Sequence, residues 1–180
     1  MHRLLTASAP ALRLLLPALL GLGASLAQAQ TSVHEEVARL LRNGQAAEAQ
    51  HQAESVLAQR PDDAQLRFLK GVAQSAQGQR AEASATYAAL TQDYPELPEP
   101  HNNLAVLHAA AGRLDEARAE LETALRLSPG YATALQNLGD VYLRLSARAW
   151  TRALELEPAS PTLRPKLQLL QPLLEPSAAR

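Results

Sequence analysis

Apolar and small residues in the middle of the chain recur every three or four positions, and they predict two short amphipathic helices within Pro98–Tyr131. Gly112 lies between the two helices, where glycine readily adopts the left-handed conformation that ends a helix. Pro129 ends the second helix, because proline cannot continue the hydrogen-bond ladder. The segment is therefore predicted to be a helical hairpin. Its periodic positions are Leu104, Ala105, Leu107 and His108, then Leu114, Ala117, Leu121, Ala124 and Leu125.

The same pattern occurs three times at one fixed spacing of 34 residues. Three residue types keep this spacing: Gly44, Gly78 and Gly112; Ala49, Ala83 and Ala117; Pro61, Pro95 and Pro129. The hairpins before the central one are expected to contain helices over residues 31–43, 45–59, 64–77 and 80–92. A helix–turn–helix repeated at this spacing resembles the tetratricopeptide repeat family.

The resemblance implies an all-α fold of the α-α superhelix class, a solenoid of stacked hairpins. It covers residues 30–158, with full repeats at 30–63, 64–97 and 98–131 and a shortened fourth repeat at 132–160. We expect one domain, followed at 159–180 by a capping helix and a frayed tail.

The fourth repeat lacks the turn that contains glycine. Leu135, Leu138, Gly139 and Tyr142 match the first helix of the family pattern, and Trp150, Ala153 and Pro158 match the second. Between these two groups five residues are missing, and no helix breaker occurs from Asp140 to Glu157. We therefore predict one continuous helix from about Thr133 to Glu157. The alternative is a very tight turn near Ser146.

The tail carries a second apolar stripe, formed by Leu163, Leu167, Leu170 and Leu174. We expect a short helix that starts near Ser160-Pro161 and is distorted at its end by Pro172. Such a helix would cover the apolar face of the last repeat, as repeat arrays require. The alternative is a docking peptide for another protein.

Residues 1–29 have the pattern of a cleavable signal peptide. Arg3 and Arg13 precede an apolar run, Leu14–Leu26. After this run, Ala27-Gln28-Ala29 supplies the small residues that a signal peptidase needs. The alternative, a membrane anchor, needs about 20 apolar residues, more than this run contains. The segment Leu138–Tyr142, with the shortened repeat, is also similar to a group of secreted bacterial tetratricopeptide proteins. We therefore expect a periplasmic protein that is not inserted in the membrane after cleavage.

Composition excludes several classes of function. The chain of 180 residues is 47% hydrophobic but only 3% aromatic, which favours helix packing through small residues. Its net charge of −1 provides no electrostatic attraction for nucleic acid or an anionic membrane surface. The absence of cysteine excludes disulfides, thiolate metal sites and a cysteine nucleophile.

The sequence contains no motif for catalysis, so we expect no enzyme activity, no cofactor and no metal. His101 and His108 share a helix face but fall at positions that pack inside the array, so they are predicted to be core histidines. Paired acids such as Asp115-Glu116 occur at helix starts, where carboxylates interact favourably with the positive end of the helix dipole.

The family resemblance implies that a protein or peptide partner binds in the concave groove lined by the first helix of each repeat. The expected partner is an envelope protein segment, and the alternative function is a structural subunit that self-associates. Phe68 is the expected aromatic anchor, and the asparagines are expected to hydrogen-bond a peptide backbone or, alternatively, to support the next helix. The predicted groove residues are Phe68, Val72, Asn102, Asn103, Val106, Gln136, Asn137, Asp140 and Arg144.

Some family members clamp the C-terminal carboxylate of chaperones with lysine or arginine at set repeat positions. None of these positions has a fixed positive charge here, so that specificity is not expected. They are occupied by Thr31, His34, Glu35, Gln65, Phe68, Leu69, Glu99, Asn102 and Asn103.

Overall fold

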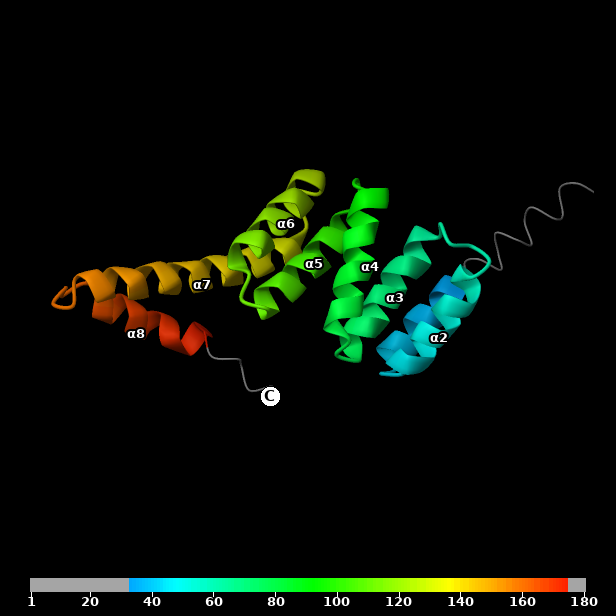
Figure 1. Ribbon diagram of the computed structural model, residues 1–180, viewed down its shortest axis with the longest axis horizontal. Helices are drawn as coiled ribbons and strands as arrows, with labels where there is room; N and C mark the ends of the chain where they lie inside the picture. The colour runs from blue at the N-terminus through cyan, green and yellow to red at the C-terminus, as the bar shows by residue number, and fades with distance from the viewer. Residues whose placement is uncertain (1–32, 175–180) are drawn as a thin grey trace, which may run out of the picture. The chain divides into compact units, whose positions relative to one another are not determined.

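The computed structural model describes residues 33–174, and all regular structure in this range is helical (Figure 1). The all-α repeat class predicted from the sequence is confirmed. The predicted signal peptide at 1–29 and the frayed end at 175–180 lie outside the described residues. A helix over residues 33–42 is followed by α2 (Ala46–Leu57), α3 (Ala64–Ala76), α4 (Arg80–Asp93), α5 (Pro98–Ala110), α6 (Leu114–Leu127), α7 (Ala132–Leu156) and α8 (Leu163–Leu174).

In each of the three hairpins, one turn that contains a glycine joins the two helices. Gly44, Gly78 and Gly112 have φ angles of 76°, 74° and 76°, in the left-handed region that favours glycine, as predicted. At the third turn the Arg113 amide donates to the His108 carbonyl at 2.9 Å, which satisfies a carbonyl group at the helix end. From α2 to α8, each helix packs against the next helix in the chain.

In the second and third repeats the two helices approach closely where the first helix carries a small residue. In the second repeat this residue is Gly71, and a Cβ atom built on it would lie 2.6 Å from Cε1 of Tyr87 on α4. At the equivalent positions of the third repeat, Ala105 and Leu121 are buried in one apolar cluster. In both repeats, a large side chain on the second helix therefore packs over a small residue on the first helix.

Asparagine side chains connect α5 to its neighbours. The Asn137 amide on α7 donates to Oδ1 of Asn102 at 2.8 Å, and Asn102 donates to Oδ1 of Asn103 at 3.1 Å. Asn103 in turn donates to the Tyr87 hydroxyl oxygen at 3.0 Å, and burial raises the pKa of Tyr87, which keeps this hydroxyl protonated. One hydrogen-bond chain therefore joins α4, α5 and α7.

The fourth repeat is a single helix, as predicted. α7 runs for 25 residues without a turn near Ser146, so the hairpin alternative is wrong. α8 lies beside the second half of α7 (Figure 1), with Leu170 buried and the Lys166 ammonium 5.3 Å from the centre of the Trp150 ring. Pro172 does not end α8, which continues to Leu174.

We predict that Gly71→Ala lowers the free energy of unfolding by about 1–2 kcal/mol, because the buried Tyr87 ring cannot move away. The better helix propensity of alanine offsets part of the clash, by up to about 1 kcal/mol. Tyr87→Leu also destabilises, because it leaves a cavity. The double variant recreates the alanine–leucine pair of the third repeat, so urea unfolding should show a favourable coupling of at least about 0.5 kcal/mol. Strict additivity of the two single changes would contradict this account of the close approach.

We predict that Asn102→Ala lowers the free energy of unfolding by about 1–3 kcal/mol, because it leaves the Asn137 amide without its partner. Gln136→Ala on the exposed side of α7 is the matched control, and its effect should stay within about 0.5 kcal/mol. Circular dichroism during urea unfolding measures both. Equal stabilities of the two variants would show that the asparagine pair does not hold α5 and α7 together.

Candidate functional site

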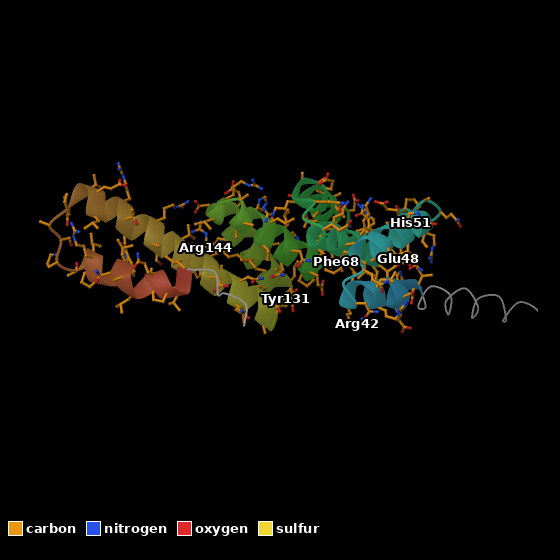
Figure 2. All side chains as sticks on the ribbon, turned by 90° about the horizontal axis from the view of Figure 1, so that it is seen from below. Arg42, Glu48, His51, Phe68, Tyr131 and Arg144 are labelled. Atoms are coloured by element: carbon orange, nitrogen blue, oxygen red, sulfur yellow. The ribbon has the colours of Figure 1, made fainter. Side chains whose placement is uncertain are left out.

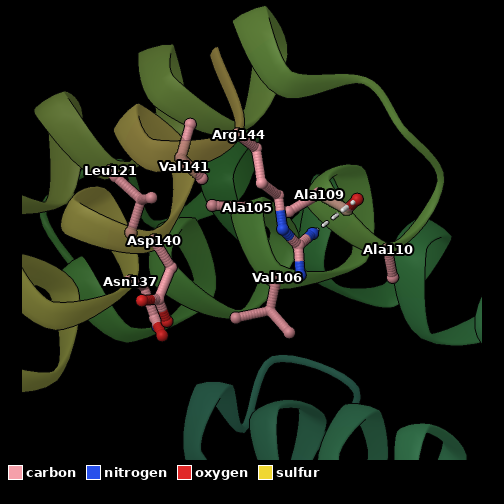
Figure 3. Close-up of a pocket in the computed structure, with 9 residues that line it drawn as sticks. All are labelled: Ala105, Val106, Ala109, Ala110, Leu121, Asn137, Asp140, Val141 and Arg144. Carbon is pink, nitrogen blue, oxygen red and sulfur yellow. Dashed lines mark hydrogen bonds between the residues drawn. The ribbon is translucent and has the colours of Figure 1, made fainter. Parts of the chain in front are cut away.

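A groove opens between α5 and α7, with a volume of about 230 Å³ (Figure 3). We call it the α5–α7 groove. It contains residues from α5, α6 and the first half of α7. Its lining residues are Ala105, Val106, Ala109, Ala110, Leu121, Asn137, Asp140, Val141 and Arg144.

The base of the groove is apolar and well packed. Ala105, Leu121 and Val141 are at most 3% exposed and belong to one buried cluster. Ala109 and Ala110 are small, so they leave open the space above this base. Val106 is 46% exposed and offers an apolar contact at the edge. Such a surface can accept an apolar side chain of a ligand without rearrangement.

Three polar side chains of α7 line one side of the groove: Asn137, Asp140 and Arg144. Their spacing of three and four residues places them on one helix face. Arg144 reaches across the groove, where its Nη1 donates to the carbonyl oxygen of Ala109 at 3.3 Å (Figure 3). That carbonyl belongs to the last turn of α5 and also accepts a hydrogen bond from the Gly112 amide at 3.1 Å. The exposed Asp140 balances the charge of Arg144, so this side of the groove is polar but neutral.

Four predicted groove residues line this cavity: Val106, Asn137, Asp140 and Arg144. Gln136 is exposed on α7 but does not line the groove. The structure gives Asn102 a different role from the predicted one. It is 3% exposed and its amide bonds inside the protein, so Asn102 supports α7, which is the alternative noted for the asparagines. Asn103 is half-buried and binds Tyr87.

Phe68 and Val72 lie on α3, do not line the α5–α7 groove, and are both half-buried. Figure 2 shows Phe68 apart from Arg144 of the groove. The Phe68 ring packs against the Tyr87 ring with 5.8 Å between centroids and 49° between planes. Much of this ring therefore stabilises the second repeat, and it is not the freely exposed aromatic that the repeat position predicted.

Leu121 was not among the predicted groove residues. It belongs to the second helix of its repeat, and the pattern assigns ligand contacts to first helices. It contributes to the base of the groove because Ala105 and Ala109 on α5 are small, although Leu121 itself is only 1% exposed. The signal that was available in the sequence is this run of small residues on one face of α5.

The two histidines of α5 make contacts within the protein. His101 is 8% exposed and its Nδ1 lies 2.6 Å from Oε2 of Glu120, which confirms its prediction as a core residue. His108 is half-buried and contacts the Arg113 guanidinium at 2.9 Å. The part of the chain that the structure describes holds no group of three or more histidine or carboxylate side chains that could bind a metal ion. No helix among residues 33–174 combines the length and apolar character needed to cross a bilayer.

Solved structures of known proteins share this fold. The first tetratricopeptide repeat domain of Spaghetti (RPAP3), bound to an HSP90 peptide, has a TM-score of 0.60 and 17% identity; the match covers 64% of this chain and 92% of that one. The Yersinia enterocolitica type III secretion chaperone SycD, in complex with a peptide of the translocator YopD, has a TM-score of 0.58 and 16% identity, over 65% and 95% of the two chains.

Sequence comparisons agree with the repeat pattern. The chain is 34% identical over 84 residues to the chloroplastic tetratricopeptide repeat domain-containing protein PYG7 of Arabidopsis thaliana. This match covers 44% of the chain but only 28% of the relative. Family descriptions of tetratricopeptide repeats match two adjoining segments, residues 40–107 and 108–146. Together with the three glycine-turned hairpins, these matches show that the chain belongs to the tetratricopeptide repeat family.

Proposed function

We propose that this chain is a protein–protein interaction scaffold that binds a peptide segment of a partner protein in the α5–α7 groove. The observation that carries the proposal is the groove itself, which has an apolar base and a neutral polar side. The proposal includes no catalytic role. The solved structures of RPAP3 and SycD contain peptides of other proteins, which supports peptide binding as the use of this fold.

The dimensions of the groove favour a peptide side chain over a small molecule or cofactor. Small-molecule sites usually have volumes of about 300–1,000 Å³ and enclose most of their ligand. The α5–α7 groove has about 230 Å³ and is open to solvent. It accommodates one apolar side chain against Val106 and the alanines, while the peptide backbone runs past α7.

Asn137, Asp140 and Arg144 then form hydrogen bonds to the main chain of the bound peptide. An asparagine amide can both donate and accept a hydrogen bond, a carboxylate accepts, and a guanidinium has five donors. Arg144 uses one donor for the Ala109 carbonyl and has others to offer. This combination suits the alternating N–H and C=O groups of an extended peptide.

The partner segment should be neutral and need not end in a carboxylate. The positions where some family members carry a clamp of lysine or arginine have Phe68, Asn102 and Asn103 here, and all three are packed or hydrogen-bonded within the protein. We therefore do not extend to this chain the HSP90 peptide that RPAP3 binds. Selectivity would come from the apolar side chain in the groove.

We predict that Val106→Arg weakens peptide binding at least about tenfold, because it places a charge at the edge of the apolar base. The probe is a set of neutral peptides selected against the chain from a random peptide library, with affinity measured by fluorescence anisotropy. Ala119→Arg, on the exposed side of α6, is the control and should bind as the original chain does. Peptides that bind both variants equally well would place the binding surface elsewhere.

The pattern of residues 1–29 supports the further proposal that the protein acts in the periplasm on a segment of an envelope protein. We predict that the chain isolated from the periplasmic fraction of its native cells begins at Gln30, because cleavage after Ala29 follows from the small residues before it. Mass spectrometry of the intact chain measures this. Recovery from the cytosolic fraction with the first residues still attached would contradict the proposed location.

A further inference from the structure

α7 carries a stripe of apolar and small residues that no part of residues 33–174 covers fully; Ser146 and Ala153 in it are half-buried and the other members are exposed. Its members alternate in spacings of four and three, and we call them the α7 stripe: Leu135, Gly139, Tyr142, Ser146, Ala149, Ala153 and Leu156. Leu135, Tyr142 and Leu156 are 52%, 46% and 70% exposed. This strict alternation is the pattern of a helix that packs along its length against another helix.

The missing turn of the fourth repeat explains why the stripe is exposed. Gly139 occupies the repeat position of Gly71, which the Tyr87 ring covers from α4. A Cβ built on Gly139 would meet nothing within 4 Å, because α7 continues straight and no second helix returns over it. The residues that match this second helix, including Trp150 and Ala153, stand on the second half of α7 itself.

We propose that a second copy of this chain covers the α7 stripe, with the two α7 helices antiparallel and a two-fold axis at the level of Arg144. In this register Tyr142 lies opposite Ser146 of the second copy, and Leu135 lies opposite Ala153. Gly139 lies opposite Ala149, next to Trp150, which has the repeat position of Tyr87. Each large side chain meets a small one, and the second half of each helix completes the fourth repeat of the other copy.

The stripe is complementary to itself, which favours a second copy over an unrelated partner. A two-fold contact requires one surface to carry both sides of the fit. Here residues that match the first helix of the repeat pattern, such as Gly139, and residues that match its second helix, such as Ala153, lie on one face of α7. The stripe also has no charged residue, as expected for the core of an interface. Arg148, on another face of α7, is already held by Asp115 of α6 at 2.7 Å.

The size of the exposed surface also suits a dimer. From Leu135 to Leu156 the stripe extends for about 33 Å at 1.5 Å per residue. On α8, Leu169 and Leu173 are 76% and 64% exposed and share a face with Lys166, which lies over Trp150, so they extend the surface beside α7. These two leucines and three stripe residues make up five of the seven large hydrophobic side chains exposed in residues 33–174. A stable dimer interface buries about 800 Å² per copy, and this cluster of exposed apolar side chains is suited to form its core.

The proposed dimer leaves the α5–α7 groove open. Asn137, Asp140 and Arg144 lie on the side of α7 opposite the stripe, because they are offset from its members by about half a helical turn. Dimerisation and peptide binding therefore use separate faces, and either can hold without the other.

Sedimentation velocity of the purified full chain over a concentration series tests the proposal, and a dimer is expected. Ala149→Glu should weaken dimerisation on the order of 100-fold, because it removes a carboxylate from water at the centre of the contact. Thr151→Glu adds the same charge to another exposed face of α7 and should leave the dimer intact. Circular dichroism checks that both variants keep their helices. A monomer at all concentrations, or a dimer that tolerates Ala149→Glu, would overturn the proposal.

Cysteine pairing tests the register, since the chain has no cysteine of its own. Copies with Gly139→Cys, mixed with copies carrying Ala149→Cys, should form a mixed disulfide-linked dimer. Either variant alone should not, because identical positions then lie ten residues, or about 15 Å, apart along the helices. Efficient linkage of the Gly139→Cys variant to itself would indicate a different arrangement and overturn the antiparallel register.

Discussion

Close approach of helices through glycine and alanine is the constraint on which this structure depends. A chain with so few aromatic residues cannot fill wide gaps between helices, so its helices must come together where side chains are small. The Gly71–Tyr87 contact shows this most clearly, because the ring occupies the space that any Cβ atom would take. In the third repeat, Ala105 and Leu121 solve the same packing problem with a smaller pair.

The α5–α7 groove follows from the same constraint. Small residues on the buried side of α5 bring helices together, and small residues that continue onto its exposed side leave a hollow with an apolar base. Polar groups occur only where α7 borders this hollow. The fold thereby produces a surface suited to holding part of another chain.

Much of this architecture was predictable from the sequence, because it rests on local rules. The glycine turns at Gly44, Gly78 and Gly112 follow from backbone sterics, and the uninterrupted α7 follows from the absence of a helix breaker between Asp140 and Glu157. The state of individual side chains was less predictable. A repeat position places Phe68 and Asn102 on the first-helix side, but their burial depends on neighbours in other helices, Tyr87 and Asn137. Such contacts are set by packing between distant segments.

The central claim is that a peptide binds in the α5–α7 groove. Titration of the isotope-labelled chain with a selected neutral peptide, followed by amide chemical shifts in NMR spectra, tests it most directly. The account predicts that the largest shifts fall on Val106, Ala109, Asp140 and Arg144, while the amides of α2 and α4 stay in place. Shifts confined to α2, α4 or α8 would contradict it.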